Sequence, residues 1–493
     1  MKTLYSFVAS LCKDQDMKLE DLQKKLKTSR TTLYRYMKGI NQITPDIAEC
    51  FAEALNMSTQ QSLEFRKLIS LSAIDRSLIE SRDVLDDFLF EKKTEPKPVF
   101  EVDMVLYDND RYLRTLKEIF DYIYSFSDKE QFVGTVKIYN CMSENIFSNI
   151  TLFLQKVFSE GASIEAEQFI GLSERDYLQN AYSFINTFPL MKYDKYKFYY
   201  KELETTEGPL PDSILVSLNY TEEGNQISKY FVMSFFENGL SDCIAFHDKY
   251  MYMYLSRIFE GLKISFTNIM RKYNNIDFDN DIFTEMKNHN NRCLLKPNPC
   301  YDKIPLHIYE KLMGRMNKEE LLDLFSSMQG HRVPEEAIPA ALNQTFAYLK
   351  DRIDSVSVSR QIDVYSKEGI TEFFETGRLT DHLELLPSFN REEIKEVLEN
   401  LYDRSNDTGS NYTMYIAEDG FGHDDFVFSV FKDYGIIFEY VFPNHTEGLW
   451  KMILIENKRL ASIFYDYFEN HIPVNNAMTK TKANEFLKSL INQ

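Results

Sequence analysis

The sequence is short of the residues that mark several protein classes. Its 493 residues include only 17 Gly and 14 Pro, which excludes collagen-like and low-complexity chains. The six cysteines form no CxxC pair, so neither a disulfide framework nor a zinc ribbon is expected. No run of 18 apolar residues occurs, and the N-terminus holds no long apolar segment. We therefore expect neither a membrane span nor a signal peptide, but a cytoplasmic protein.

The residues that are present fit a folded protein with aromatic-rich cores. Hydrophobic residues make up 44% of the chain, and 38 Phe and 31 Tyr stand beside a single Trp. The net charge of −20 is unevenly divided, because residues 1–70 carry 11 basic and 8 acidic residues and the remainder carries −23. A small basic head on a large acidic body is typical of a chain that touches phosphate with one end only.

Residues 1–70 show five successive short helical patterns. Apolar residues recur at a spacing of three or four, Ser29 is placed to cap a helix over residues 30–38, and Pro45 opens the next helix. Two short helices joined by a turn form the arrangement that presents the second helix to a DNA major groove. The candidate DNA-binding residues lie on or just before that helix: Ser29, Arg30, Thr31, Thr32, Tyr34, Arg35 and Lys38.

These side chains suit the chemistry of DNA. Arginine bridges a guanine edge, threonine contacts thymine methyl groups, and Lys38 suits a phosphate. The segment from Leu22 to Met57 resembles the Cro/C1-type (XRE) helix-turn-helix family, with Gln23 where that family usually has alanine. The resemblance implies a double-stranded DNA partner, a homodimer and a role in transcription regulation. The alternative is a five-helix module whose basic helix has no such role.

Residues 71–98 connect the head to the body. Apolar residues from Leu71 to Phe88 alternate at three- and four-residue spacing, with Ser81 as one polar position. This stripe fits either a helix that pairs two heads or a connector packed on its own chain. The segment 91–98 holds two prolines and five charged residues and is the best linker candidate.

The body contains an internal repeat. Three segments of the first copy match three of the second in order: 218–224 with 414–420, 231–236 with 426–431, and 244–249 with 453–458. The first two matches read as strands joined by an acidic-glycine turn, and the third reads as a buried strand that leads into a helix. The expected fold class is therefore α/β (α+β) multidomain, with an all-α helix-turn-helix head and a duplicated α/β effector body.

The expected domains are 1–70 for the head, 71–98 for the connector, 99–285 for the first effector repeat and 286–493 for the second. The strand order that ends each repeat resembles the effector domains of TrmB-type regulators, which have a phospholipase-D-like fold. Each repeat closes with an amphipathic helix. We expect the apolar face of one helix, from Leu255 to Leu262, to pack against that of the other, from Leu460 to Phe468.

A phospholipase-D-like active site needs two His-x-Lys-x4-Asp motifs, because histidine is the nucleophile and lysine holds the phosphate. His247 and Lys249 supply the first positions, but Tyr254 stands at the Asp position. The second copy has Glu456 in place of histidine. We therefore expect that the protein is not an enzyme.

Other candidate sites are few. His423 and the two aspartates after it are adjacent in a turn, and adjacent residues rarely converge on one metal ion. We expect no metal and no cofactor. A candidate ligand pocket has an aromatic and methionine lining: Phe235, Phe246, Met251 and Tyr254. Packing between the two repeats is the alternative explanation for this apolar run.

Together these features predict a cytoplasmic, homodimeric, DNA-binding transcriptional regulator with a large C-terminal body for sensing and dimerisation. The effector would be a small molecule, a peptide or a protein, and no membrane partner is expected. One alternative is a DNA-anchored scaffold or defence component that recruits a protein partner. A second alternative is a phosphodiesterase or nuclease on a phospholipase-D-like fold.

Overall fold

The computed structural model describes residues 4–15, 17–38, 43, 45–90, 125, 131–140, 144–173, 176–203, 212–235, 243–246, 248–273, 291–329, 332–358, 360–379, 386–407, 409–418, 420–421, 426–440 and 452–493. The chain divides into two compact units. The first comprises Met1–Val84, Leu172–Ala181 and Glu202–Thr206, and the second comprises Leu85–Gly171, Tyr182–Lys201 and Glu207–Gln493. No helix in the described residues is long and apolar enough to span a membrane.

Five helices form the N-terminal head, as predicted: α1 (Leu4–Asp14), α2 (Leu19–Lys25), α3 (Arg30–Met37), α4 (Pro45–Ala54) and α5 (Thr59–Phe90). Their apolar faces meet in one core that contains Leu22, Leu33 and Phe51. The ring of Phe51 lies 5.4 Å from that of Phe65, so α4 and α5 pack through aromatic side chains.

Helix α5 is longer than the sequence patterns suggested. It runs unbroken for 32 residues, and the predicted division between 70 and 71 therefore falls inside it. Its sequence has no Gly or Pro that would end a helix. Ser81, Leu85 and Phe88 are at most 2% exposed, so this half of the predicted stripe is already buried in its own chain. The structure thus favours the connector interpretation here, and these three residues are not available to pair two heads.

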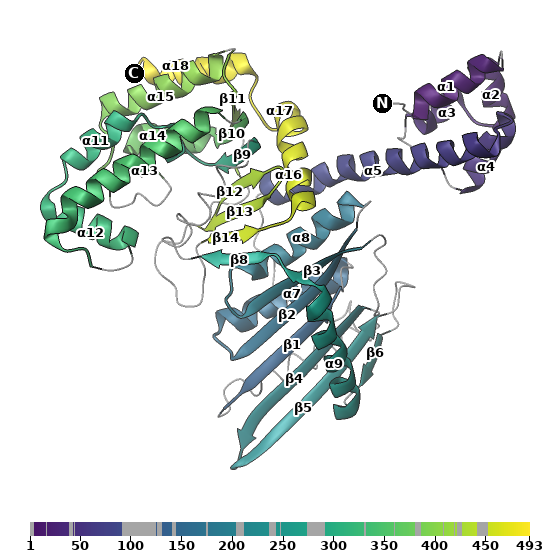
Figure 1. Cartoon of the computed structure of the whole chain (residues 1–493), viewed down its shortest axis with the longest axis horizontal. Helices are drawn as coiled ribbons and strands as arrows, with labels where there is room; N and C mark the ends of the chain where they lie inside the picture. Colours follow the sequence, from purple (N-terminus) through teal and green to yellow (C-terminus); the bar gives the residue numbers. More distant parts are fainter. Residues whose placement is uncertain are drawn as a thin grey trace, which may run out of the picture. The chain divides into compact units, whose positions relative to one another are not determined.

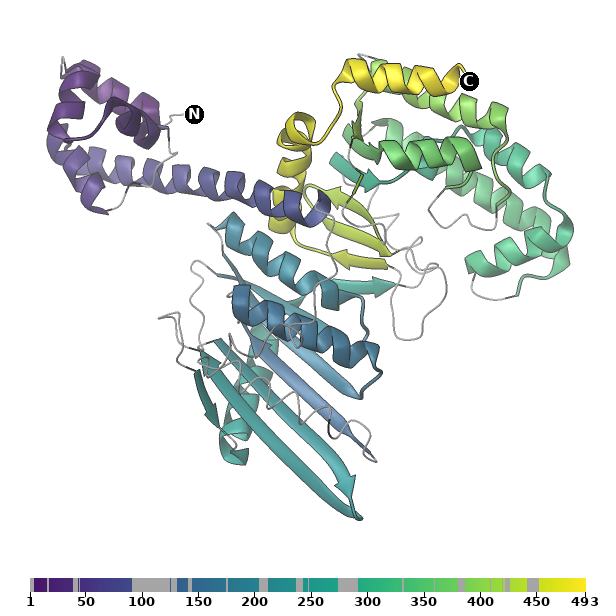
Figure 2. The same ribbon diagram turned by 180° about the vertical axis from the view of Figure 1, so that it is seen from behind.

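The first of two sheets has the strand order β6-β5-β4-β1-β2-β3-β7 (Figure 1). Its strands are β1 (Val133–Tyr139), β2 (Ile164–Ser173), β3 (Tyr196–Leu203), β4 (Asp212–Glu222), β5 (Asn225–Phe235), β6 (Cys243–Phe246) and β7 (Thr267–Asn268). Helix α9 (Lys249–Ser265) covers one face. Helices α7 (Glu144–Ser159) and α8 (Tyr177–Met191) lie on the opposite face, as the view from behind shows (Figure 2).

The second sheet has the order β11-β10-β9-β12-β13-β14-β8. Its strands are β8 (Met270–Tyr273), β9 (Asn291–Lys296), β10 (Arg360–Ser366), β11 (Tyr412–Ala417), β12 (Phe426–Phe431), β13 (Gly435–Tyr440) and β14 (Met452–Ile455). One large core contains residues of β9–β11 and of the helices α11 (Leu306–Gly314), α12 (Lys318–Gln329), α13 (Ile338–Val358), α14 (Lys367–Thr376), α15 (Arg391–Asn406) and α18 (Lys480–Ile491). Helices α16 (Lys458–Asn470) and α17 (Ile472–Asn475) follow β14.

The two sheets repeat one topology, as the predicted duplication requires. The order β3-β2-β1-β4-β5-β6 in the first sheet corresponds to β11-β10-β9-β12-β13-β14 in the second. Strand β1 is parallel to β2 and antiparallel to β4, and β9 is likewise parallel to β10 and antiparallel to β12. Helices α9 and α16 begin at equivalent N-caps, Asp248 and Asn457, which confirms the third predicted match.

The other two predicted matches are wrong by one strand. In the first repeat, Glu223 and Gly224 form the tight turn of a β4–β5 hairpin, where both residues have positive φ. In the second repeat, β11 and β12 are not neighbours, because β10 and β9 lie between them. Strand β4 therefore corresponds to β12 and β5 to β13. Strands with similar apolar alternation align readily out of register, since a sequence window does not record which strands pair.

The chain crosses directly from one sheet to the other after α9. Strand β7 pairs with β3 of the first sheet, and β8, two residues later, pairs with β14 of the second. The half-buried Lys272 on β8 donates through Nζ to the carbonyl of Tyr196 (2.9 Å), and burial lowers its pKa to about 8. Residues 270–273 thus belong to the second sheet, although the sequence placed the whole segment 99–285 in the first repeat.

The closing helices do not pack against each other as predicted. Phe259 and Leu262 of α9 are buried with Tyr139 and Phe169 of the first sheet. Phe464 of α16 lies 4.9 Å from Phe428 of the second sheet. Each helix therefore buries its apolar face on its own sheet, which is the nearest apolar surface along the chain.

The two repeats are instead joined by α8. Its Phe188 ring lies 4.5 Å from Phe438 and 5.0 Å from Phe426 of the second sheet. Phe88, near the end of α5, contacts the same ring at 5.1 Å. Asp86 of α5 accepts hydrogen bonds from Tyr467 Oη (2.6 Å) and from Asn476 Nδ2 (2.9 Å). The C-terminal end of α5 is thereby held in the body.

Candidate functional site

Helices α2 and α3 form the predicted helix-turn-helix. The apolar side of α3 faces the head core through Leu33 and Met37, and α2 contributes Leu22. Lys25 at the end of α2 donates through Nζ to the carbonyl of Ala54 (3.0 Å), which ties α2 to the end of α4. The ammonium group of this lysine is therefore used within the head.

The opposite side of α3 is a continuous polar and basic surface. Residues spaced by three or four along a helix share one face, and those exposed here are Arg30, Thr31, Tyr34, Arg35 and Lys38. Lys38 Nζ lies 5.1 Å from the centre of the Tyr34 ring, and Tyr5 meets that ring edge-on at 6.0 Å. These contacts hold Tyr34 and Lys38 side by side on the exposed surface.

Ser29 and Thr32 have a different role from the rest of the predicted set. The backbone N–H of Thr32 donates to Ser29 Oγ (3.0 Å), so Ser29 is the N-cap of α3. The two hydroxyl groups also lie 2.7 Å apart. These two residues fix the start of the helix.

The candidate ligand pocket is only partly described. Helix α9 buries Tyr252, whereas Met251 and Tyr254 are 39% and 63% exposed and point away from the core. The side chains of Phe235 and Phe246 lie outside the described residues, as do His247 and His423. The described members therefore form an outer surface of α9 and do not line an enclosed cavity.

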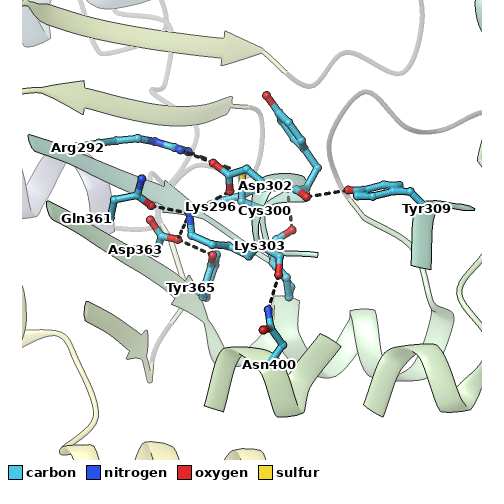
Figure 3. Close-up of polar contacts among 12 residues, drawn as sticks. Arg292, Lys296, Cys300, Asp302, Lys303, Tyr309, Gln361, Asp363, Tyr365 and Asn400 are labelled. Atoms are coloured by element: carbon cyan, nitrogen blue, oxygen red, sulfur yellow. Dashed lines mark hydrogen bonds and ion pairs between the residues drawn. The ribbon is translucent and has the colours of Figure 1, made fainter. Parts of the chain in front are cut away.

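Sequence reasoning missed a buried polar network in the second repeat (Figure 3). Arg292 on β9 is directly opposite Gln361 on β10, and Leu294 is opposite Asp363. Asp302 and Lys303 come from the turn after β9 and lie over these strands. All four charged side chains are buried. Charges so far from water are retained only where they pair and form hydrogen bonds.

Each of the four charged side chains has an oppositely charged partner, although Arg292 Nε and Asp363 Oδ1 form no hydrogen bond among the described residues. Lys303 Nζ lies 3.0 Å from Asp302 Oδ1, 2.7 Å from Gln361 Oε1 and 3.4 Å from Asp363 Oδ2. Arg292 pairs with the other oxygen of Asp302. Burial alone would raise the pKa of Asp302, but Lys303 and Arg292 outweigh it and hold this pKa well below its usual value.

A buried tyrosine, Tyr365, extends the network. Tyr365 Oη donates to Asp363 Oδ2 (2.8 Å), and burial, with Asp363 nearby, raises the pKa of this phenol well above its usual value. Asn400 on α15 donates to the carbonyl of Lys303 (2.7 Å). Among the described residues, no three His, Cys, Asp or Glu side chains are placed to hold a metal ion. The hydrogen bonds of the network join β9, β10 and α15.

Comparison with known proteins identifies the head. Residues 8–61 match the helix-turn-helix family model of the Cro/C1 (XRE) type. No curated protein sequence matches the chain. The matched segment covers α2 and α3 and the exposed face of α3, so the N-terminal head is a helix-turn-helix domain of a DNA-binding transcriptional regulator.

Proposed function

We propose that this protein regulates transcription as a dimer, and that its two-sheet body controls how the heads engage DNA. The observation that supports this most directly is the exposed face of α3, with Arg30, Arg35 and Lys38 around Tyr34, within a matched helix-turn-helix. Arginine reads guanine by two hydrogen bonds, and lysine neutralises phosphate. Two half-sites about one helical turn apart require two heads.

The continuity of α5 supports the role of the body. Phe65, in the first half of this helix, lies in the head core, and Phe88, near its C-terminal end, contacts Phe188. Asp86 holds the last turns against Tyr467 and Asn476. A change in the body that moved these contacts would act on the helix that carries the head. An effector molecule or a protein partner is the expected cause of such a change.

The proposal includes no catalytic role. In the second repeat, Glu456 precedes the N-cap Asn457, as His247 precedes Asp248 in the first. Its carboxylate accepts hydrogen bonds from Arg271 (2.7 Å) and from Tyr434 Oη (3.0 Å). The position equivalent to a second catalytic histidine therefore holds an acidic residue engaged in structural contacts.

The DNA-binding proposal is tested by substitutions on α3. Arg35→Ala should weaken binding to a duplex selected by the full chain by about 1–3 kcal/mol and relax its base preference. Lys38→Ala should weaken binding to all duplexes by the same factor. It should also reduce the slope of log K against the logarithm of the salt concentration by about 1. Fluorescence anisotropy at several salt concentrations measures both effects.

The matched control is Arg66→Ala, which removes an exposed arginine on α5 beside Glu49 (4.0 Å) and outside the α3 face. It should leave base preference unchanged. The proposal is wrong if random-sequence selection enriches no duplex, or if Arg35→Ala binds the selected duplex as tightly as the unaltered protein.

A further inference from the structure

The outer face of α9 is apolar over its first two turns and again at Ile264, with Arg257 exposed between these two parts. Five of the twelve large hydrophobic side chains exposed in the described part of the chain lie on this helix: Tyr250, Met251, Met253, Tyr254 and Ile264. Tyr250 is 81% exposed and Ile264 is 90% exposed. Figure 1 shows α9 as the outermost layer on its face of the first sheet. An apolar surface gathered in this way marks an interaction site.

The folding of the chain itself does not require this surface. Helix α9 already packs on the first sheet through Tyr252, Phe259 and Leu262, which occupy its inner face. A helix that is apolar on both sides is expected to be covered on both sides. The inner half of α9 is covered by its own sheet, and within the described part of the chain no residue covers the outer half.

The second repeat provides an internal comparison. With Asp248 and Asn457 as equivalent N-caps, Tyr250 corresponds to Arg459 and Met253 to Ser462. Tyr254 corresponds to Ile463, which is fully buried. The equivalent helix is therefore polar where it is open and apolar only where it is covered. The exposed apolar residues of α9 are a property of this one position and not of the repeated fold.

We propose that α9 is the dimerisation helix, and that α9 of a second copy packs antiparallel on its outer face. This inference rests on the proposed function, because a helix-turn-helix regulator needs a partner head for the second half-site. The apolar stripe predicted on α5 does not provide this dimer contact, because Ser81, Leu85 and Phe88 are buried within the chain. A two-fold axis uses one surface twice, which fits a single self-complementary helix.

The size and shape of the surface fit this occupant. With roughly 200 Å² for a large side chain, the five residues offer about 600 Å² per copy, against about 800 Å² per partner in a standard interface. Antiparallel pairing about Arg257 sets Tyr250 opposite Ile264 and Met253 opposite Gly261. A Cβ atom built on Gly261 has nothing within 4 Å, so the methionine has room there. Each Arg257 then reaches the Tyr254 ring of the second copy.

Light scattering coupled to gel filtration, at micromolar concentration, tests the inference with the full chain. The unaltered protein should have twice the chain mass of 58.1 kDa. Tyr250→Glu and Ile264→Glu should each give the single-chain mass, because each places a carboxylate opposite an apolar side chain of the second copy. The control Val474→Glu places the same charge at a 77% exposed apolar residue of α17 and should remain dimeric.

A second measurement separates this inference from the proposed function. On a duplex with two half-sites, both α9 variants should lose at least about tenfold in affinity, while binding to a single half-site stays within about twofold. If the unaltered protein is a dimer and the α9 variants are monomers, but the dimer binds no DNA, the proposed function is wrong and the proposed interface is correct. A monomeric unaltered protein, or variants that stay dimeric, would overturn the inference. Ile264→Glu decides if Tyr250→Glu unfolds, since Ile264 contributes almost nothing to the core.

Discussion

Replacement of Lys303 by methionine should destabilise the protein by about 3–5 kcal/mol, which is a large part of the roughly 5–15 kcal/mol that holds a domain folded. The side chain keeps its length but loses its charge. Asp302 and Asp363, both buried, then lose the ammonium group at 3.0 and 3.4 Å. Arg292 alone remains to balance the first, and Gln361 loses its hydrogen-bond donor.

Urea unfolding followed by circular dichroism measures this loss. The matched control is Lys311→Met, which removes a lysine from an exposed pair with Glu396 (3.6 Å). That change should cost under about 1 kcal/mol, because water already solvates both groups. Equal effects from the two substitutions would contradict the structural role assigned to the network.

The effect should also depend on pH. The pKa of Asp302 is lower in the folded chain than in the unfolded chain, so its ionised form contributes stability at neutral pH. This contribution is complete above the unfolded value of about 3.9 and is lost as the pH falls toward the folded value. The difference between the unaltered protein and Lys303→Met should therefore narrow in acid.

The head was predictable because its determinants are local. Ser29 caps α3 and Pro45 begins α4 where the sequence placed them. The exposed positions of α3 follow from helical spacing once Leu33 and Met37 are assigned to the core. Family resemblance over the same segment then gave the DNA partner. The predicted division between residues 70 and 71 falls inside α5 for a related reason. No local signal in the sequence marks where a continuous helix passes from the head to the body.

The body was less predictable because its determinants are distant in sequence. The pairing of β9 with both β10 and β12 joins segments separated by helices, and a strand pattern does not state its neighbour. The sequence does not indicate that Asp302 and Asp363 are buried, because only the fold places Lys303 between them. The sequence pattern of α8 also did not indicate that this helix packs on the second sheet.

That packing makes Phe188 the second residue with a large expected effect. Phe188→Ala should destabilise the body by about 3–5 kcal/mol, because it removes a buried ring and leaves a cavity. The ring is within 5.1 Å of Phe88, Phe426 and Phe438, so the cavity opens where α5, α8 and the second sheet meet. Differential scanning calorimetry should show one transition for the unaltered protein and two for the variant, since the repeats lose their shared contact.

Phe325→Ala is the control that separates a junction from an ordinary core position. Phe325 on α12 is as well buried, but it packs only within the helical core of the second repeat. Phe325→Ala should lower the free energy of unfolding by a similar amount. The variant should still unfold in a single transition, because α8 and β8 continue to join the two sheets. If both variants unfold in one transition, β8 alone is sufficient for coupling. If both unfold in two, the second repeat is independently unstable and α8 is not the element that joins the repeats.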